Sequence, residues 1–162
     1  MTTKKKVTLA ITIPIAIILV AILCLVSIYG IDILKDKIAR KGWTEIDYCN
    51  DRWDVQIPKA TIEYTFSDRG GWFGDGETYT VCKYSTRPDE FLKDFKADIK
   101  VKNLNKYNEI IEHLQSSGID TNKLIEPDEN YIWLHKEQNS LDNLFLVYNQ
   151  QTNTLYIVES LI

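Results

Sequence analysis

The sequence is poor in the residues on which most hydrolytic and metal-dependent chemistry depends. It has only two histidines among 162 residues, His113 and His135. They form no HExxH-type spacing, and no serine lies in a nucleophile-elbow motif. His113 follows Glu112 on an expected helix and is interpreted as a surface residue, whereas His135 ends an expected strand. These absences leave no assigned catalytic residue, no metal ligand and no cofactor.

Cysteine is also scarce, with three residues in the chain. Cys24 lies in an apolar run, and only Cys49 and Cys82 remain outside it. Their separation is unlike the short paired spacing of a zinc site. In an oxidising compartment they can form a disulfide that closes a loop of about 33 residues and contributes about 3–4 kcal/mol in the loop-entropy model. Two buried free thiols are nearly as well supported.

Charge is absent from residues 7–31, which consist mainly of Ile, Leu, Val and Ala. As a helix this run extends about 37 Å, enough for a hydrocarbon core of about 30 Å. A cleaved signal peptide has a shorter apolar stretch and a small-residue cleavage site, and Leu23 before Cys24 does not suit a lipoprotein. A buried soluble helix of this length usually has a polar face. The sequence therefore predicts an uncleaved transmembrane helix over 7–31, preceded by a short tail, 1–6.

Basic residues flank this run almost equally. Lys4, Lys5 and Lys6 precede it, and four basic residues follow it between 35 and 41. The positive-inside rule counts Lys and Arg near the span, so here it decides little. The lysines packed against its start favour a cytoplasmic N-terminus. We expect a single-pass cell-membrane protein with its domain outside.

The remaining 131 residues suit one domain of common size. They contain all 23 acidic residues and 16 of the 19 basic ones, a net charge of −7. Such an acidic domain disfavours nucleic acid as a partner, because phosphate binding needs a basic face. We divide this part into a juxtamembrane helix and linker, 32–54, whose helix stops at Gly42, and an extracytoplasmic domain, 55–162.

Periodicity predicts an α+β domain with a mainly antiparallel sheet and two helices on one face. The expected strands are 59–67, 77–84, 131–136, 143–148 and 155–159, and the expected helices are 86–97 and 104–117. In the first strand Ala60, Ile62, Tyr64 and Phe66 alternate with polar residues and are expected to share one face. The strands 131–136 and 143–148 are apolar on both faces and are expected to be central.

Glycine is rare, yet four of the seven glycines lie in the loop between the first two strands. The loop residues are Gly70, Gly71, Trp72, Phe73, Gly74, Asp75 and Gly76. Three interpretations compete. The aromatic side chains can fold back onto the core, which is the commonest outcome. The loop can bind a peptide or a sugar through Trp72. The weakest is calcium bound by Asp68, Asp75 and Glu77, because the EF-hand spacing is absent.

The stretch Arg69-Gly-Gly-Trp-Phe-Gly-Asp-Gly76 is similar to a His-Gly-Gly-Phe-x-Gly-Asp-Gly motif of small Gram-positive cell-envelope proteins. Gly70, Gly71, Gly74, Asp75 and Gly76 match this motif, Trp72 replaces the Phe, and Arg69 takes the His position. The closing segments 143–148 and 153–158 also resemble that group's C-terminal hairpin. The resemblance covers about residues 55–160. It implies an envelope protein with a short α+β domain and brings no activity with it.

These observations favour a non-enzymatic domain, tethered through residues 7–31, that binds an unknown protein or envelope component. The alternative is an envelope hydrolase that uses carboxylates near the glycine-rich loop, with Asp75 and Glu77 as candidates. An immunity or exclusion protein of a mobile element fits the same anchor.

Overall fold

The computed structural model describes residues 20, 22, 35, 38–70, 74–97, 105–125 and 131–162. The chain divides into two compact units, residues 1–43 and Thr44–Ile162. The predicted span lies outside the described residues except for Val20 and Ile22, which are helical. No helix among the residues described here combines the length and the apolarity that a membrane crossing needs. At the end of the first unit Gly42 has φ +90°, after a turn that follows Ala39, which agrees with the predicted helix stop.

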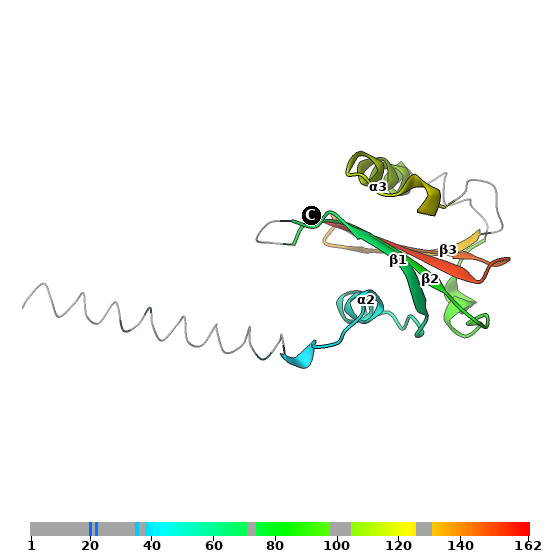
Figure 1. Ribbon diagram of the computed structural model, residues 1–162, viewed down its shortest axis with the longest axis horizontal. Helices are drawn as coiled ribbons and strands as arrows, with labels where there is room; N and C mark the ends of the chain where they lie inside the picture. Colours follow the sequence, from blue (N-terminus) through cyan, green and yellow to red (C-terminus); the bar gives the residue numbers. More distant parts are fainter. Residues whose placement is uncertain are drawn as a thin grey trace, which may run out of the picture. The chain divides into compact units, whose positions relative to one another are not determined.

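The second unit is built on one five-stranded antiparallel sheet, so the predicted α+β class is confirmed (Figure 1). Its strands are β1 (Thr61–Ser67), β2 (Gly76–Lys83), β3 (Tyr131–Gln138), β4 (Asp142–Asn149) and β5 (Thr154–Leu161). Their order across the sheet is β1-β2-β5-β4-β3. The β1–β2 pair forms one group of strands and β3, β4 and β5 form the other, and the two groups are joined where β5 pairs with β2. The β1–β2 and β4–β5 pairs are hairpins, as expected.

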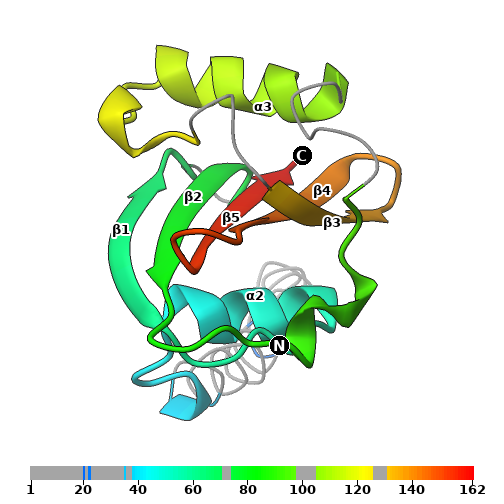
Figure 2. The ribbon, with the colours of Figure 1, turned by 90° about the vertical axis from the view of Figure 1, so that its right-hand side faces the viewer.

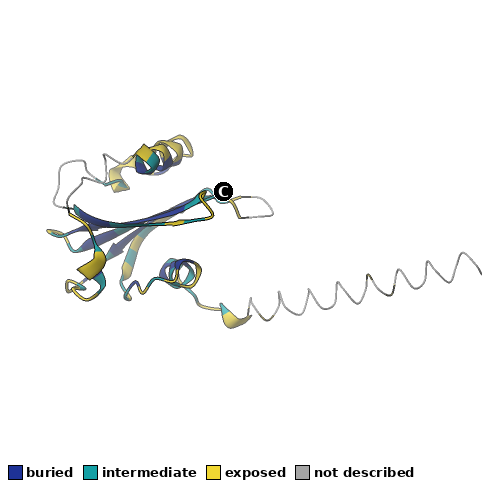
Figure 3. Cartoon of the chain, turned by 180° about the vertical axis from the view of Figure 1, so that it is seen from behind, coloured by how far each residue is buried: buried dark blue, intermediate teal, exposed yellow. Residues whose placement is uncertain are grey.

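The two α-helices, α2 (Glu45–Trp53) and α3 (Asn105–Ser116), cover opposite faces of this sheet (Figure 2). The prediction of helices on one face is therefore wrong. Leu155 and Ile157 of β5 pack in the α2 cluster, while Val158 packs in the α3 cluster. Figure 3 shows the buried sides of both helices against the sheet. The inner strands are apolar on both sides because each side meets a helix.

Helix α2 lies in the segment 43–54, which the sequence analysis places in the linker, and it belongs to the folded unit that begins at Thr44. Thr44 caps it: the Thr44 side chain accepts a hydrogen bond from the backbone of Asp47, and the Asp47 carboxylate accepts one from the backbone of Thr44. This reciprocal capping box satisfies two of the free N–H groups at the helix start. Ile46, Cys49 and Trp53 are buried on one side of the helix.

Helix α3 matches the predicted helix 104–117 in its described part. Tyr107, Ile110 and Leu114 are its buried residues. Gly118 has φ +96°, and the backbone N–H of Ile119 donates to the carbonyl of Leu114. Glycine takes this left-handed conformation without a Cβ penalty, so it ends the helix and turns the chain toward the sheet.

A β-bulge corrects the prediction that Ala60, Ile62, Tyr64 and Phe66 share one face. Ile62 pairs with Cys82 and Tyr64 with Val81, so Glu63 is an extra residue between consecutive partners. One inserted residue moves all later side chains to the other face. Ala60 and Ile62 accordingly pack toward α2, and Tyr64 and Phe66 toward α3.

Strand β3 is an edge strand and not central, whereas β4 lies inside the sheet as expected. The edge of β3 is partly covered, because Lys96 and Trp133 exchange two backbone hydrogen bonds of 2.8 and 2.9 Å. That pairing requires an extended chain at Lys96. The predicted helix 86–97 is therefore reduced to the single 3₁₀ turn η1 (Phe91–Asp94). Covering part of an edge in this way hinders pairing with other chains.

We expect Leu114→Ala to lower the free energy of unfolding by about 2–5 kcal/mol, because Leu114 is fully buried between α3 and the sheet. Chemical denaturation followed by circular dichroism measures this loss. The neighbouring exposed Gln115→Ala is the matched control and should change stability by less than about 0.5 kcal/mol. Equal effects of the two substitutions would contradict the packing of α3 described here.

Candidate functional site

The glycine-rich loop connects β1 to β2 at one end of the sheet. Gly70 and Asp75 form an isolated antiparallel bridge, in which the N–H of Gly70 donates to the carbonyl of Asp75 at 3.3 Å. Gly71, Trp72 and Phe73 lie outside the described residues. The described part is thus the base of the loop, where the chain leaves the sheet and returns to it.

Gly76 is the glycine that this base requires. Its φ is +128°, and a Cβ atom there would lie 2.9 Å from the Cα of Arg69 and 2.9 Å from Oδ1 of Asp68. Any other residue would combine an unfavourable backbone conformation with a collision against the segment on the other side of the loop base. Gly74 also has positive φ, +73°, but a Cβ there would meet no atom within 4 Å.

On the α2 face, the base of the loop is held by the carboxylate of Glu159, which is 5% exposed. Its Oε1 accepts hydrogen bonds from Arg52 Nη1 at 2.8 Å and from Trp53 Nε1 at 2.5 Å. Its Oε2 pairs with Nη2 of Arg69, the residue that precedes the first loop glycine. A buried carboxylate needs such partners, because an unpaired charge in the interior is costly. Arg69 therefore ties the loop to strand β5 and, through Glu159, to α2.

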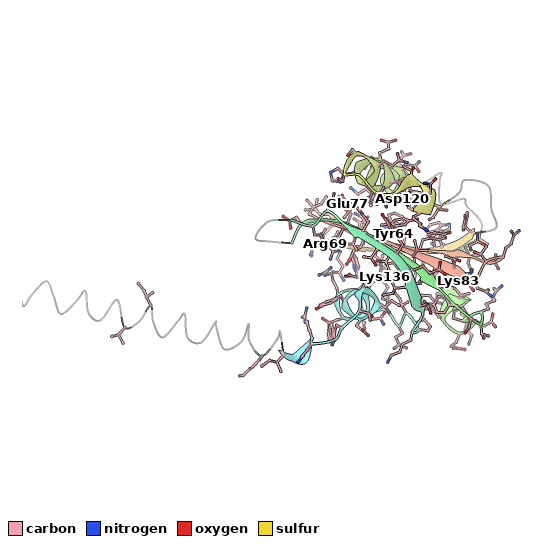
Figure 4. The ribbon with its side chains drawn as sticks, in the orientation of Figure 1. Tyr64, Arg69, Glu77, Lys83, Asp120 and Lys136 are labelled. Carbon is pink, nitrogen blue, oxygen red and sulfur yellow. The ribbon has the colours of Figure 1, made fainter. Side chains whose placement is uncertain are left out.

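On the α3 face, a second polar cluster holds the other side of the loop base. His113 Nδ1 of α3 contacts Oε2 of Glu77 and lies 3.5 Å from Oδ2 of Asp68. Ser117 donates to Oδ2 of Asp68 at 2.7 Å, and Ser160 donates to Oε1 of Glu77 at 3.3 Å. Figure 4 shows Glu77 and Arg69 at the same end of the β1–β2 hairpin, with Lys83 at the other end of β2.

The carboxyl group of Asp68 is held in its ionised form. Partial burial acts to raise its pKa, but hydrogen bonds from the Ser117 hydroxyl and from the backbone N–H of Glu77 outweigh burial. The pKa of Asp68 is therefore lowered from its ordinary value. Asp68 is thus ready to act as an anionic hydrogen-bond acceptor or ligand.

The structure brings together only part of the residues proposed from the sequence. Asp68 and Glu77 converge, whereas Asp75 is exposed and does not join their cluster. His113, which the sequence suggested was a simple surface residue, supplies the third group. The apolar spacing of α3 predicts that Leu114 is buried, so His113 is expected to lie beside the buried side of the helix. This spacing does not identify the strand residues that His113 contacts.

Cys49 and Cys82 are free, buried and part of one core cluster beside α2. Burial is the main cause that raises the pKa of both thiols, to about 12 for Cys82. A thiol that stays protonated is a poor nucleophile. Thiol catalysis by these two residues is therefore disfavoured.

Other chemistry-bearing groups lie away from the loop. His135 stacks on Phe145, with a ring-centroid distance of 4.2 Å, and its Nε2 lies 3.0 Å from Oδ1 of Asn143. Two open pockets of about 430 and 420 Å³ lie at other parts of the domain. One pocket is bordered by the segment that follows α2 and by η1. The other is bordered by Lys83, Tyr131 and Tyr156. Neither is lined by Asp75 or Glu77.

Taken together, the fold and the site define a small α+β domain with a loop fixed at its base on both faces of the sheet. No protein-family model, curated protein or solved structure matches this chain.

Glu159→Gln tests the network on the α2 face. We expect the free energy of unfolding to fall by about 3 kcal/mol, because the substitution leaves the largely buried Arg69 without its carboxylate partner. Denaturant titration measures the change. The exposed Glu137→Gln removes the same charge elsewhere on the sheet and should be nearly neutral. A loss below about 1 kcal/mol for Glu159→Gln would show that this network does not hold the fold.

Proposed function

We propose that this protein is a single-pass, membrane-anchored protein whose domain binds a partner protein or a cell-envelope component through the loop 70–76. The observation that carries the proposal is the fixed base of that loop. Arg69 pairs with the buried Glu159 on one face, and Asp68 accepts a hydrogen bond from Ser117 on the other. Only glycine fits at position 76, where the two ends of the loop approach each other closely.

The fixed base of the loop 70–76 favours binding of a partner. A loop whose ends are held by a sheet loses less conformational entropy on binding than a free segment does. The loop sequence adds Trp72 and Phe73, large aromatic residues that are frequent anchors of binding surfaces. Asp75, which follows them in the sequence, offers an exposed carboxylate. These groups suit a peptide or a sugar ring better than they suit an ion.

The proposed membrane anchor is the uncharged run 7–31. Val20 and Ile22, its two described residues, are helical and 59% and 50% exposed. Exposed aliphatic side chains on a helix are what a lipid-facing segment presents. The lysines before the run and the resemblance to envelope proteins support a domain outside the cell.

Binding is better supported than hydrolysis. The hydrolase alternative needs Asp75 and Glu77 to act on one substrate, but Asp75 is exposed while Glu77 is buried against His113 and Ser160. Acid–base catalysis requires both groups within hydrogen-bond reach of the reacting atoms. The described cysteines are buried, and their raised pKa values disfavour a mechanism with a thiolate nucleophile.

Loop variants in native membranes test the binding function. Trp72→Ala and Asp75→Ala should each reduce chemically crosslinked complexes recovered with the full chain roughly tenfold, the effect of losing one central contact. Trp72→Phe should retain most of the crosslinking, because it keeps the aromatic ring. Glu137→Ala, an exposed carboxylate on β3, is the matched control for Asp75→Ala. Unchanged crosslinking in both alanine variants, with or without a change in stability, would contradict a binding role for the loop.

The proposed orientation is tested by protease treatment of intact cells and spheroplasts. A domain outside the membrane should be digested in spheroplasts without detergent, since the protease reaches it directly. A cytoplasmic protein of the same cells serves as the control for intact membranes. Protection of the domain in spheroplasts would contradict the orientation and leave the binding loop to be tested on the cytoplasmic side.

A further inference from the structure

We propose that Asp68, Glu77 and His113 form a binding site for one divalent first-row transition-metal ion, with Zn²⁺ as the ion that fits best. Asp68 directly follows β1, Glu77 lies at the start of β2, and His113 lies in the last turn of α3. The inference does not depend on what the loop 70–76 binds. It also replaces the calcium interpretation, since it includes a histidine and leaves out Asp75.

The donor atoms already converge. One ligand atom of each residue lies within 4.8 Å of the other two. Zinc bonds to nitrogen and oxygen ligands are about 2.0–2.2 Å long, so tetrahedral ligands stand about 3.4 Å apart. The separation of 3.5 Å between His113 Nδ1 and Asp68 Oδ2 already has this value. A small rotation that separates His113 from Glu77 would admit an ion between all three.

The charge balance of the cluster favours a cation. Two carboxylates with exposed fractions of 16% and 12% face each other, and neither forms an ion pair with Lys or Arg in the part of the chain that the structure describes. Arg69, the nearest arginine in sequence, pairs with Glu159 on the opposite face. Converging carboxylates in a partly buried site need a compensating positive charge, which a divalent ion provides.

Neighbouring groups orient both carboxylates for this role. The backbone N–H of Glu77 donates to Oδ1 of Asp68 at 2.6 Å, and Ser117 donates to Oδ2, which lies 3.5 Å from His113 Nδ1. Ser160 donates to Oε1 of Glu77, which leaves Oε2 on the side of His113. Hydrogen bonds of this kind hold metal-binding carboxylates in place and are a regular part of such sites.

The donor set and the exposure select the ion. His113 is 55% exposed, so an ion can reach the cluster from solvent. Calcium and magnesium prefer sites built wholly from oxygen ligands, whereas one imidazole with two carboxylates suits zinc. Three protein ligands leave a fourth position for water or for a group of a bound partner. An ion here would join α3 to both ends of the glycine-rich loop.

The test uses the untagged full chain in detergent, stripped of metal, with Zn²⁺ alone as the probe. Competition with a chromophoric chelator should show one ion bound per chain, and the melting temperature should rise with Zn²⁺. His113→Gln should lower the Zn²⁺ affinity roughly tenfold or more and remove the melting-temperature rise. This variant changes a half-exposed side chain, so circular dichroism should show the same fold. Glu77→Gln should have the same effect on Zn²⁺ binding.

The adjacent exposed Glu112→Gln is the matched control and should bind Zn²⁺ as the unaltered chain does. Ca²⁺ at the same concentration should leave the melting temperature unchanged. Zn²⁺ binding that is equal in the His113→Gln and unaltered chains would overturn the proposal. So would the absence of bound Zn²⁺ together with a lower melting temperature for His113→Gln, since His113 would then be only an ion-pair partner of the carboxylates.

Discussion

Burial of the central strand β5 on both faces is the constraint on which the rest of the domain depends. Leu155 and Ile157 face one side and Val158 faces the other, and all three are almost inaccessible to solvent. A sheet with two apolar faces needs two covering layers, since either face left open would expose a large hydrophobic surface. The chain meets this need with α2, placed before the sheet, and with α3, placed between the two groups of strands.

The same strands bring charge into the covered region at the loop end of the sheet. Glu159 of β5 lies on the α2 face, and Glu77 of β2 lies on the α3 face. The two faces compensate these carboxylates differently. Glu159 receives two arginines and an indole N–H, whereas Glu77 meets His113 and Ser160. Because each cluster also includes a residue of the loop base, the burial of charge and the position of the loop are coupled.

This coupling connects the proposals for the binding loop and for the metal site. If the loop recognises a partner, its shape at the base is set by groups already satisfied within the domain. An ion held by Asp68, Glu77 and His113 would add a constraint from α3. The α3 face of the loop base, where His113 remains half exposed, is then the place where an ion or a partner's group has access, whereas the α2 face is closed by Trp53 and Glu159.

Local pattern determined the α+β class, the β1–β2 and β4–β5 hairpins, and helix α3 with its glycine stop, because side-chain periodicity and capping act over a few residues. The capping box at Thr44 and Asp47 is a local feature of the same kind. Only the tertiary structure decided the bulge at Glu63, the opposite placement of the helices and the meeting of His113 with Glu77. His113 and Glu77 are 36 residues apart, and no local rule specifies which long-range partners a folded sheet brings together.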